Sequence, residues 1–245
     1  MQPAEQQQKK RSPWLYVGIG CGCLLLLGVG AFVAGGVFLV KKGQQLQQDM
    51  ANPITRTELV KKTLGAQTLP EGYYAVMSIS VPALVDTAVL SNRAPGTPQS
   101  GQPGGEIVFV YLFIKPSTVQ DREGLRRYLE GESEDASVLT RNNIHVGKNE
   151  LIGRGVLALE GRRVLYLAQR GELQTRHSES ESKGPLLNSI LFIECPGQDR
   201  LRMALWMAPD PAPGKPLEQL ELKGTPVDPE TMRTFMSHIN PCQES

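Results

Sequence analysis

The four cysteines of this 245-residue chain are the residues whose chemistry is easiest to specify, and they form two pairs. Cys21 and Cys23 stand one residue apart near the front of an apolar run, which suggests lipid attachment, a metal pair or small residues of a membrane helix. A metal site needs further ligands, and residues 14–40 contain no His, Asp or Glu. A lipoprotein signal needs its apolar segment before the acceptor cysteine, whereas here most of that segment follows it. We therefore interpret both cysteines as small residues of a membrane helix.

The second pair, Cys195 and Cys242, lies at the ends of expected elements. Cys195 closes an expected strand, Cys242 follows an expected helix, and each neighbours a proline. Outside the reducing cytosol two such cysteines can form a disulfide, whereas in the cytosol they stay free thiols. We expect a disulfide, because no other cysteine follows the apolar run.

Catalytic signatures are missing from the sequence. The segment RHSESESK offers His177, Glu179 and Glu181 at alternating positions, which a strand would place on one face. A metal needs three or four converging ligands, and a run of Ser and Glu between strands is more typical of a solvated hairpin tip. His145 and His238 stand alone, and no nucleophile, metalloprotease or phosphate-loop motif occurs. We predict no catalytic residue, no metal ligand and no cofactor.

Several arginines fall on the expected hairpins of the second half of the chain. They are Arg162, Arg163, Arg170, Arg200 and Arg202. Spread over neighbouring strands, they could form an anion-binding surface or a salt-bridged, solvated face of a sheet. The second interpretation is favoured, because no motif concentrates them.

The apolar run predicts one transmembrane helix over residues 14–40. Its 27 uncharged residues would extend about 40 Å as a helix, enough to cross a hydrocarbon core about 30 Å thick. Basic residues bound it at 9–11 and at 41–42, and the aromatic residues Trp14 and Tyr16 stand at one end. A cleaved signal peptide would have a shorter apolar region followed by a polar stretch. We expect an uncleaved signal-anchor.

Glycines within the span suggest helix packing. Gly18 and Gly22 form a GxxxG pair, which lets two helix backbones approach closely. Glycine is also simply common in membrane helices. The sequence leaves both interpretations open, and the first predicts a weak homodimer through the span.

The segments around the span set the domain organisation and the orientation. We expect a disordered polar tail over 1–13, a stalk with a short helix over 41–69, and one domain over 70–245 with a mobile loop at 91–105. Basic residues flank both ends of the span, so the positive-inside rule does not decide its orientation. The expected disulfide favours a cytoplasmic N-terminus and an extracytoplasmic domain, in the periplasm.

Charge limits the partners of the domain. Of 26 Lys and Arg, five precede residue 43, and of 25 Asp and Glu, one does. The remaining 21 and 24 give residues 43–245 a net charge of −3. A mildly acidic domain without a basic cluster argues against nucleic-acid binding.

The domain is predicted to have the α+β class. Asn52, Pro53 and Gly65 predict the ends of a short helix. Strands are expected over 73–81 and 107–114, the second apolar on both faces and therefore central, and a helix over about 119–130. Two hairpins should follow, the first turning at Glu160-Gly161 and the second at Pro196–Asp199.

A final helix should cover the sheet. Asp228 caps it, Pro229 takes its first position, and an apolar stripe follows at helical spacing. The stripe consists of Met232, Phe235, Met236 and Ile239. The whole pattern predicts an antiparallel sheet covered by helices.

This element order, with its closing helix, resembles the PsbP-like fold of the extrinsic photosystem protein family over residues 70–240. The resemblance implies a sandwich of sheet and helices and carries over no functional residue. The whole chain also resembles bacterial envelope proteins that combine a short polar tail, one span and one outer domain.

These observations leave two functional classes. The first is a membrane-anchored interaction or ligand-binding domain with a protein partner in the envelope. The second is an envelope enzyme whose site is assembled from scattered residues. Converging carboxylates or histidines would favour the enzyme, whereas an exposed apolar patch would favour the interaction domain.

Overall fold

The fold was analysed in a computed structural model of the chain. The structure describes residues 50–81, 84–97, 105–114, 122–141, 150–171, 185–198 and 202–243. The chain divides into two units, Met1–Ala51 and Asn52–Ser245, and the fold below is that of the second.

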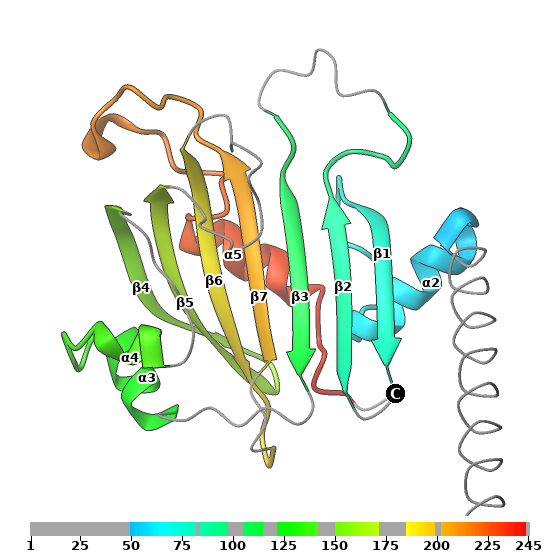
Figure 1. Ribbon diagram of the computed structural model, residues 1–245, viewed down its shortest axis with the longest axis horizontal. Coiled ribbons are helices and arrows are strands. Elements are labelled where there is room, and N and C mark those ends of the chain that lie inside the picture. The colour runs from blue at the N-terminus through cyan, green and yellow to red at the C-terminus, as the bar shows by residue number, and fades with distance from the viewer. Residues whose placement is uncertain are drawn as a thin grey trace, which may run out of the picture. The chain divides into compact units, whose positions relative to one another are not determined.

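A seven-stranded antiparallel sheet dominates this unit, in the order β1-β2-β3-β7-β6-β5-β4 (Figure 1). Its strands are β1 (Tyr74–Val81), β2 (Val85–Ser91), β3 (Val108–Ile114), β4 (Glu150–Leu159), β5 (Arg162–Gly171), β6 (Leu186–Glu194) and β7 (Arg202–Pro209). The last strand, β7, pairs with β3 on one side and with β6 on the other. It therefore joins two halves of the sheet that are otherwise separate. Both predicted hairpins and the central position of β3 are confirmed.

Helices pack on both faces of the sheet, which confirms the α+β class. They are α2 (Pro53–Leu64), α3 (Arg122–Leu129), α4 (Ser137–Arg141) and α5 (Pro229–Ser237), with a 3₁₀ turn at Leu217–Gln219. In Figure 1, α5 crosses behind β7 and β3, whereas α3 and α4 lie beside β4. We call the two sides of the sheet the α5 face and the α3 face.

Local sequence signals set the ends of α2 and α5. The Asn52 side chain accepts hydrogen bonds from the first turn of α2, and Gly65 ends that helix with a φ of 60°. A Cβ on Gly65 would lie 1.9 Å from the backbone oxygen of Asn240, so the close approach also requires glycine. Asp228 accepts from the Thr231 amide, and Pro229 takes the first position of α5. These predictions are confirmed.

The largest core lies on the α5 face. Val60 and Leu64 of α2 and the whole predicted stripe of α5 are at most 5% exposed. They pack against alternate residues of β3, namely Phe109, Tyr111 and Phe113, and against neighbouring strands. The predicted role of the last helix as a cover for the sheet is confirmed.

A second core lies on part of the α3 face. Leu125, Tyr128 and Leu129 are buried, as the helical pattern predicted. Together with α4 they cover side chains of β5 and β6, including Leu165 and Phe192. The described part of this helix begins at residue 122, and residues 115–121 lie outside the described residues.

Three details differ from the sequence analysis. A regular strand over 73–81 would put Ala75 and Ser78 on opposite faces, but an irregularity between Ala75 and Met77 puts both on the same buried face. A separate strand, β2, occupies 85–91, so the predicted loop begins after Ser91, and its residues 98–104 lie outside the described residues. The short helix α4 was not predicted.

Among the described residues, no helix combines the length and the hydropathy needed to cross a bilayer. The predicted tail, the span over 14–40 and most of the stalk lie outside the described residues.

Candidate functional site

The α3 face of β1, β2 and β3 carries a row of apolar side chains that belongs to none of the buried clusters. Alternate residues of each strand point to this side, and the register brings the three rows together. The residues are Met77, Ile79, Val81, Val85, Thr87, Val89, Val108, Val110, Leu112 and Ile114. We call this surface the open face.

No described helix packs on the open face. The helices α3 and α4 cover β5 and β6 on this side, whereas α2 and α5 pack on the other side of the sheet. All of its residues are therefore partly exposed, and the exposed fraction is highest at Val81 and Ile114, with 37% and 42%. A row of aliphatic residues at this exposure costs free energy in water unless another surface covers it.

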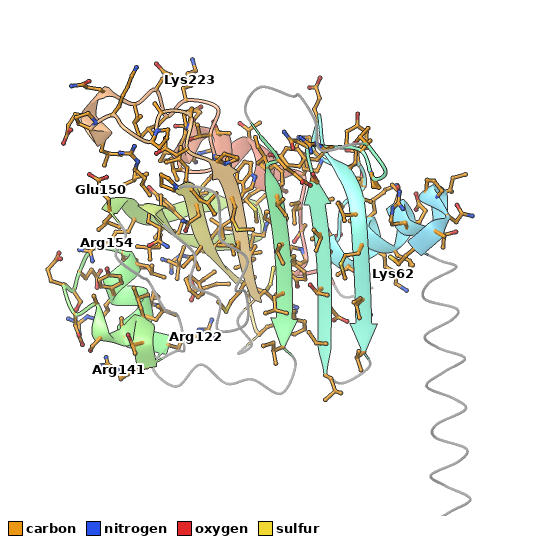
Figure 2. All side chains as sticks on the ribbon, turned by 45° about the horizontal axis from the view of Figure 1, so that its top comes forward. Lys62, Arg122, Arg141, Glu150, Arg154 and Lys223 are labelled. Carbon is orange, nitrogen blue, oxygen red and sulfur yellow. A yellow bond between two sulfur atoms is a disulfide. The ribbon has the colours of Figure 1, made fainter. Side chains whose placement is uncertain are left out.

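The open face carries no charge and no aromatic ring. Its only polar residue is Thr87, whose hydroxyl donates to the Tyr111 backbone oxygen at 2.7 Å. Figure 2 shows the labelled charged residues elsewhere, with Arg122, Arg141 and Arg154 on the side of α3 and α4. The open face can therefore contribute to binding mainly through the burial of its apolar area.

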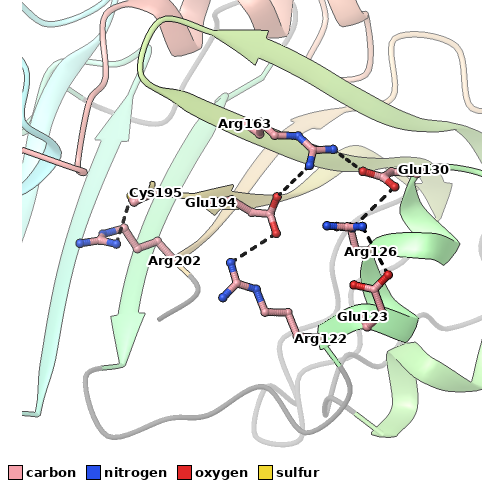
Figure 3. Close-up of polar contacts among 8 residues, drawn as sticks. All are labelled: Arg122, Glu123, Arg126, Glu130, Arg163, Glu194, Cys195 and Arg202. Carbon is pink, nitrogen blue, oxygen red and sulfur yellow. Dashed lines mark hydrogen bonds and ion pairs between the residues drawn. The ribbon is translucent and has the colours of Figure 1, made fainter. Parts of the chain in front are cut away.

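Charged residues gather instead between α3 and the sheet (Figure 3). Glu130 binds Arg163 and also lies 3.7 Å from Arg126 Nε. Glu194 lies 3.7 Å from Arg163 Nη1 and 3.4 Å from Arg122 Nη2. The Glu130 and Glu194 side chains are only 14% and 12% exposed, and each faces two guanidinium groups. This arrangement fastens α3 to β5 and β6.

A buried arginine lies beside the disulfide. Arg202 is 4% exposed, and its Nη1 lies 3.1 Å from the Cys195 sulfur. Its guanidinium also stacks 4.4 Å from the centre of the Phe113 ring. Burial raises the pKa of Tyr111 well above its usual value, although the charge of Arg202 and its hydrogen bond partly oppose that rise. Tyr111 therefore stays protonated.

Aromatic side chains fill the centre of the α5 face. The Trp206 indole donates to the Tyr73 hydroxyl at 3.1 Å, and Phe235 packs on both rings. Burial raises the pKa of Tyr73 to about 12, although the hydrogen bond from Trp206 lowers it in part. A phenol held neutral in this way packs as part of the core and is not a general base at neutral pH.

The predicted disulfide is present. Cys195 and Cys242 are bonded, with their Cα atoms 5.4 Å apart and 47 positions apart in sequence. The bond joins the end of β6 to the segment after α5. Gly18 and Gly22, predicted to pack the span, lie outside the described residues.

The four described arginines do not form one surface, so neither an anion-binding patch nor a solvated face describes them together. Arg162 donates to the Met236 backbone oxygen at the end of α5. Arg170 binds Asp210, and both are nearly buried. Arg163 points to the opposite side and joins the network of Figure 3, whereas Arg200 lies outside the described residues. Strand register, which the sequence does not reveal, separates them.

Of the other chemical candidates, His238 alone lies within the described residues. His238 is exposed near the end of α5. His145, His177, Glu179 and Glu181 lie outside the described residues. Within the part of the chain that the structure describes, no three or more of His, Cys, Asp and Glu are grouped so that they could hold a metal.

Sequence reasoning missed the open face, although a signal for it existed. The stretch IVFVYLFI is apolar on both faces, which predicts a central strand. The structure confirms the central position, but described helices cover only the α5 face of this strand. The neighbouring strand segments MSISV and VDTAV contain further aliphatic residues, and these were a second signal for the open face.

Comparisons with protein-family models, with curated proteins and with solved structures find no match for this chain.

Proposed function

We propose that this protein is a membrane-anchored, extracytoplasmic interaction domain that binds a protein partner in the envelope through the open face. The open face is the observation that carries the proposal. The largest apolar patch on a monomeric soluble protein measures about 300–600 Å² and is often a functional site.

The size of the open face is suited to a modest interface. Strands lie about 4.8 Å apart and rise about 3.3 Å per residue, so three strands of about seven residues give a footprint of about 330 Å². Stable complexes bury about 800 Å² per partner. Contact through this surface alone is therefore weak, and an anchor that holds both partners in one membrane would strengthen it.

The disulfide supports the proposed location. Structural disulfides persist in oxidising compartments and are rare in the cytosol of mesophiles. The Cys195 side of the bond is buried, as expected of a structural bond. We place the N-terminal tail in the cytoplasm and the domain in the periplasm.

The anchor in this proposal is an uncleaved span over residues 14–40. The proposal includes a weak homodimer that forms through Gly18 and Gly22 of the span. It includes no binding of nucleic acids. The covering of one antiparallel sheet by α5 on one face and by α3 and α4 on the other supports a PsbP-like sandwich. An envelope enzyme with a dispersed site remains the alternative, and no specific observation among the described residues favours it.

Location is tested by fusing alkaline phosphatase after Ser245, because this enzyme folds only where disulfides form. We expect an active fusion in intact cells. The matched control fuses a reporter that is active only in the cytoplasm to the same residue, and we expect it to be silent. An inactive phosphatase fusion at normal expression would contradict the location.

Interaction is tested with a photo-crosslinking amino acid placed at Val110 of the full chain in living cells. The matched control places it at Thr234, which is exposed on α5. We expect protein adducts from Val110 and few from Thr234. Equal labelling from both sites would show that the open face has no special role in binding.

A further inference from the structure

Arg202 is a buried cation that lies against a sulfur atom instead of a carboxylate. Its Nη1 lies 3.1 Å from the Cys195 sulfur, and its other contacts are with the Phe113 ring and Tyr111. Its Nε has no hydrogen-bond partner, and among the described residues no ion pair includes it. Figure 3 shows that the other labelled arginines face glutamates. Burying a charge without a counter-charge costs free energy, so this position calls for a chemical reason.

Strand register places Arg202 beside the sulfur. Arg202 pairs with Ile193 across β7 and β6, and Cys195 follows Ile193 by two residues on the same face of the sheet. Glu194 points to the opposite face and binds other arginines there (Figure 3). Tyr111 is neutral near pH 7, because burial raises the pKa of its hydroxyl. In the described structure, Arg202 is therefore the charged group that faces this sulfur.

A guanidinium stabilises a thiolate far more than it stabilises a disulfide. The sulfur of a disulfide is at most a weak hydrogen-bond acceptor, whereas a thiolate is an anion that forms a charge-assisted pair with arginine. In thiol–disulfide exchange, a thiolate attacks one sulfur of the bond and the other sulfur leaves as a thiolate. Arg202 therefore favours the direction of attack in which Cys195 is the leaving sulfur.

Burial favours the same direction. Cys195 is 4% exposed, whereas Cys242 is partly exposed, so a thiolate in solution reaches Cys242 more easily. We propose that Cys242, Cys195 and Arg202 form a thiol–disulfide exchange site whose substrates are external thiols, dithiols and their disulfides. The site lies on the α5 face, so it does not depend on binding at the open face.

Reduction at this site has two steps. An external thiolate attacks the Cys242 sulfur, the bond to Cys195 breaks, and its electron pair stays on the Cys195 sulfur beside Arg202. A second external thiolate attacks the external sulfur of the mixed disulfide and releases Cys242, which takes a proton from water. Two external thiols are thereby oxidised to one disulfide, and the bond in the protein is reduced. In reverse, an external disulfide closes the bond, and the Cys195 thiolate expels the external thiolate from Cys242.

The direction of attack is tested on the purified full chain with Cys21→Ser and Cys23→Ser, so that only the cysteines of the bond remain. The probe is β-mercaptoethanol, whose uncharged body excludes attraction of the reagent to Arg202. The reaction is stopped in mildly acidic denaturant with N-ethylmaleimide, and mass spectrometry locates both labels. We expect the β-mercaptoethanol adduct on Cys242 and the maleimide on Cys195. Adducts mainly on Cys195 would overturn the proposal.

The role of Arg202 is tested by the rate of the first step in the same chain. We expect Arg202→Met and Arg202→Gln to slow this step about tenfold, because the leaving thiolate loses its counter-charge, and Arg202→Lys to keep most of the rate. Arg122→Met is the matched control, because Arg122 contacts Glu194 on the opposite face, and it should leave the rate nearly unchanged.

A purely structural role of Arg202 predicts the opposite result. Neutral variants would then loosen the core around the bond and speed up its reduction. Each rate is measured again at low denaturant concentrations, because a rate that stays constant reports on the folded chain. An unchanged or faster rate in the folded neutral variants overturns the proposal.

A titration separates the charge of Arg202 from its packing. In the same chain with Cys242→Ser, Cys195 is the one remaining cysteine, and ultraviolet absorbance follows its ionisation. We expect its thiolate to persist to a lower pH with Arg202 or Arg202→Lys than with Arg202→Met or Arg202→Gln. A titration that does not depend on the charge at position 202 would overturn the proposal.

Discussion

Phe235 is the side chain that joins α5 most closely to the sheet. Its ring centre lies 4.1 Å from that of Trp206 and 4.9 Å from that of Phe109. Truncating an enclosed phenylalanine to alanine costs about 3–5 kcal/mol. We expect Phe235→Ala to lower the unfolding free energy of a 50–245 fragment by this amount, measured by chemical denaturation.

The control for this substitution lies on the same helix. Glu230 is exposed in the first turn of α5, and we expect Glu230→Ala to change the unfolding free energy by less than about 1 kcal/mol. Equal, small effects of both substitutions would mean that α5 is not part of the core.

Asp228 makes the stability of α5 depend on pH. Burial alone would raise the pKa of its carboxyl, but hydrogen bonds from Thr231 and from neighbouring backbone amides outweigh this, so its pKa is lowered. A lowered folded-state pKa stabilises the fold fully above the unfolded value of about 3.9, and this part is lost as the pH falls through the folded pKa. We expect Asp228→Ala to cost about 1 kcal/mol at pH 7 and less in acid.

Denaturation of the same fragment at pH 7 and below pH 4 measures this effect. Asp228→Asn is the control, because an amide oxygen still accepts the capping hydrogen bond but does not titrate. Its difference from Asp228→Ala should therefore vary little with pH. A cost of Asp228→Ala that grows in acid would contradict the assigned sign.

Single residues differ in how far the sequence predicts their partners. Cys195 and Cys242 could be paired from the sequence, because the domain offers only one combination. The partners of the arginines could not be predicted, because neighbouring residues such as Arg162 and Arg163 point to opposite faces and meet α5 and α3, which are distant in sequence.

The disulfide fastens one element to another. It ties the segment after α5 to the end of β6 across 47 residues. For a loop of this length the chain-entropy model gives about 4 kcal/mol of stabilisation. We expect Cys195→Ala with Cys242→Ala to lower the unfolding free energy by about this amount, measured on the same fragment.

Reduction provides the control for that pair. A reductant should destabilise the natural fragment to a similar extent and leave the double variant unchanged. A loss below about 1 kcal/mol in both measurements would show that packing alone holds the C-terminal segment.

A buried ion pair fastens the loop after β7 to β5. Arg170 Nε donates to Asp210 Oδ2 at 2.6 Å, and its other nitrogens donate to the Ala212 and Lys215 backbone oxygens. Removing one partner of a buried pair leaves an uncompensated charge and costs about 3–5 kcal/mol. We expect Asp210→Ala to show a loss of this size in thermal or chemical denaturation.

Glu150 supplies the matched control. Its carboxylate lies 3.6 Å from the same arginine, but its side chain is 51% exposed. Exposed pairs contribute little, so Glu150→Ala should cost less than about 1 kcal/mol. Comparable losses for Glu150→Ala and Asp210→Ala would contradict the importance of burial.

Among the helices and strands, the ends of the helices could be predicted from local residues, whereas the pairing of the strands could not. Helix ends at Asn52, Gly65 and Asp228 follow from hydrogen bonds within a few residues, and the sequence showed them. The irregularity in β1 and the insertion of β7 next to β3 depend on contacts between distant segments. No pattern within either segment carries that information.

The whole molecule includes a predicted anchor that can be tested separately from the domain. A GxxxG pair at Gly18 and Gly22 lets two helices approach closely, and a larger residue would push them apart. We expect Gly22→Ile to lower the signal of a membrane two-hybrid assay made with residues 1–49. A strong signal that Gly22→Ile leaves unchanged would mean that the glycines only reflect composition.

The position of β7 has a consequence for how this chain is made. Synthesis proceeds from the N-terminus, so β1–β3 and β4–β6 are both complete before β7 exists. Until then β3 and β6 each present an unpaired edge, and unpaired edges invite association with other chains. Native closure of the sheet must wait for residues 202–209, and the disulfide must wait for Cys242. The two halves of the sheet that are made first must therefore avoid pairing with other chains until β7 is added between them.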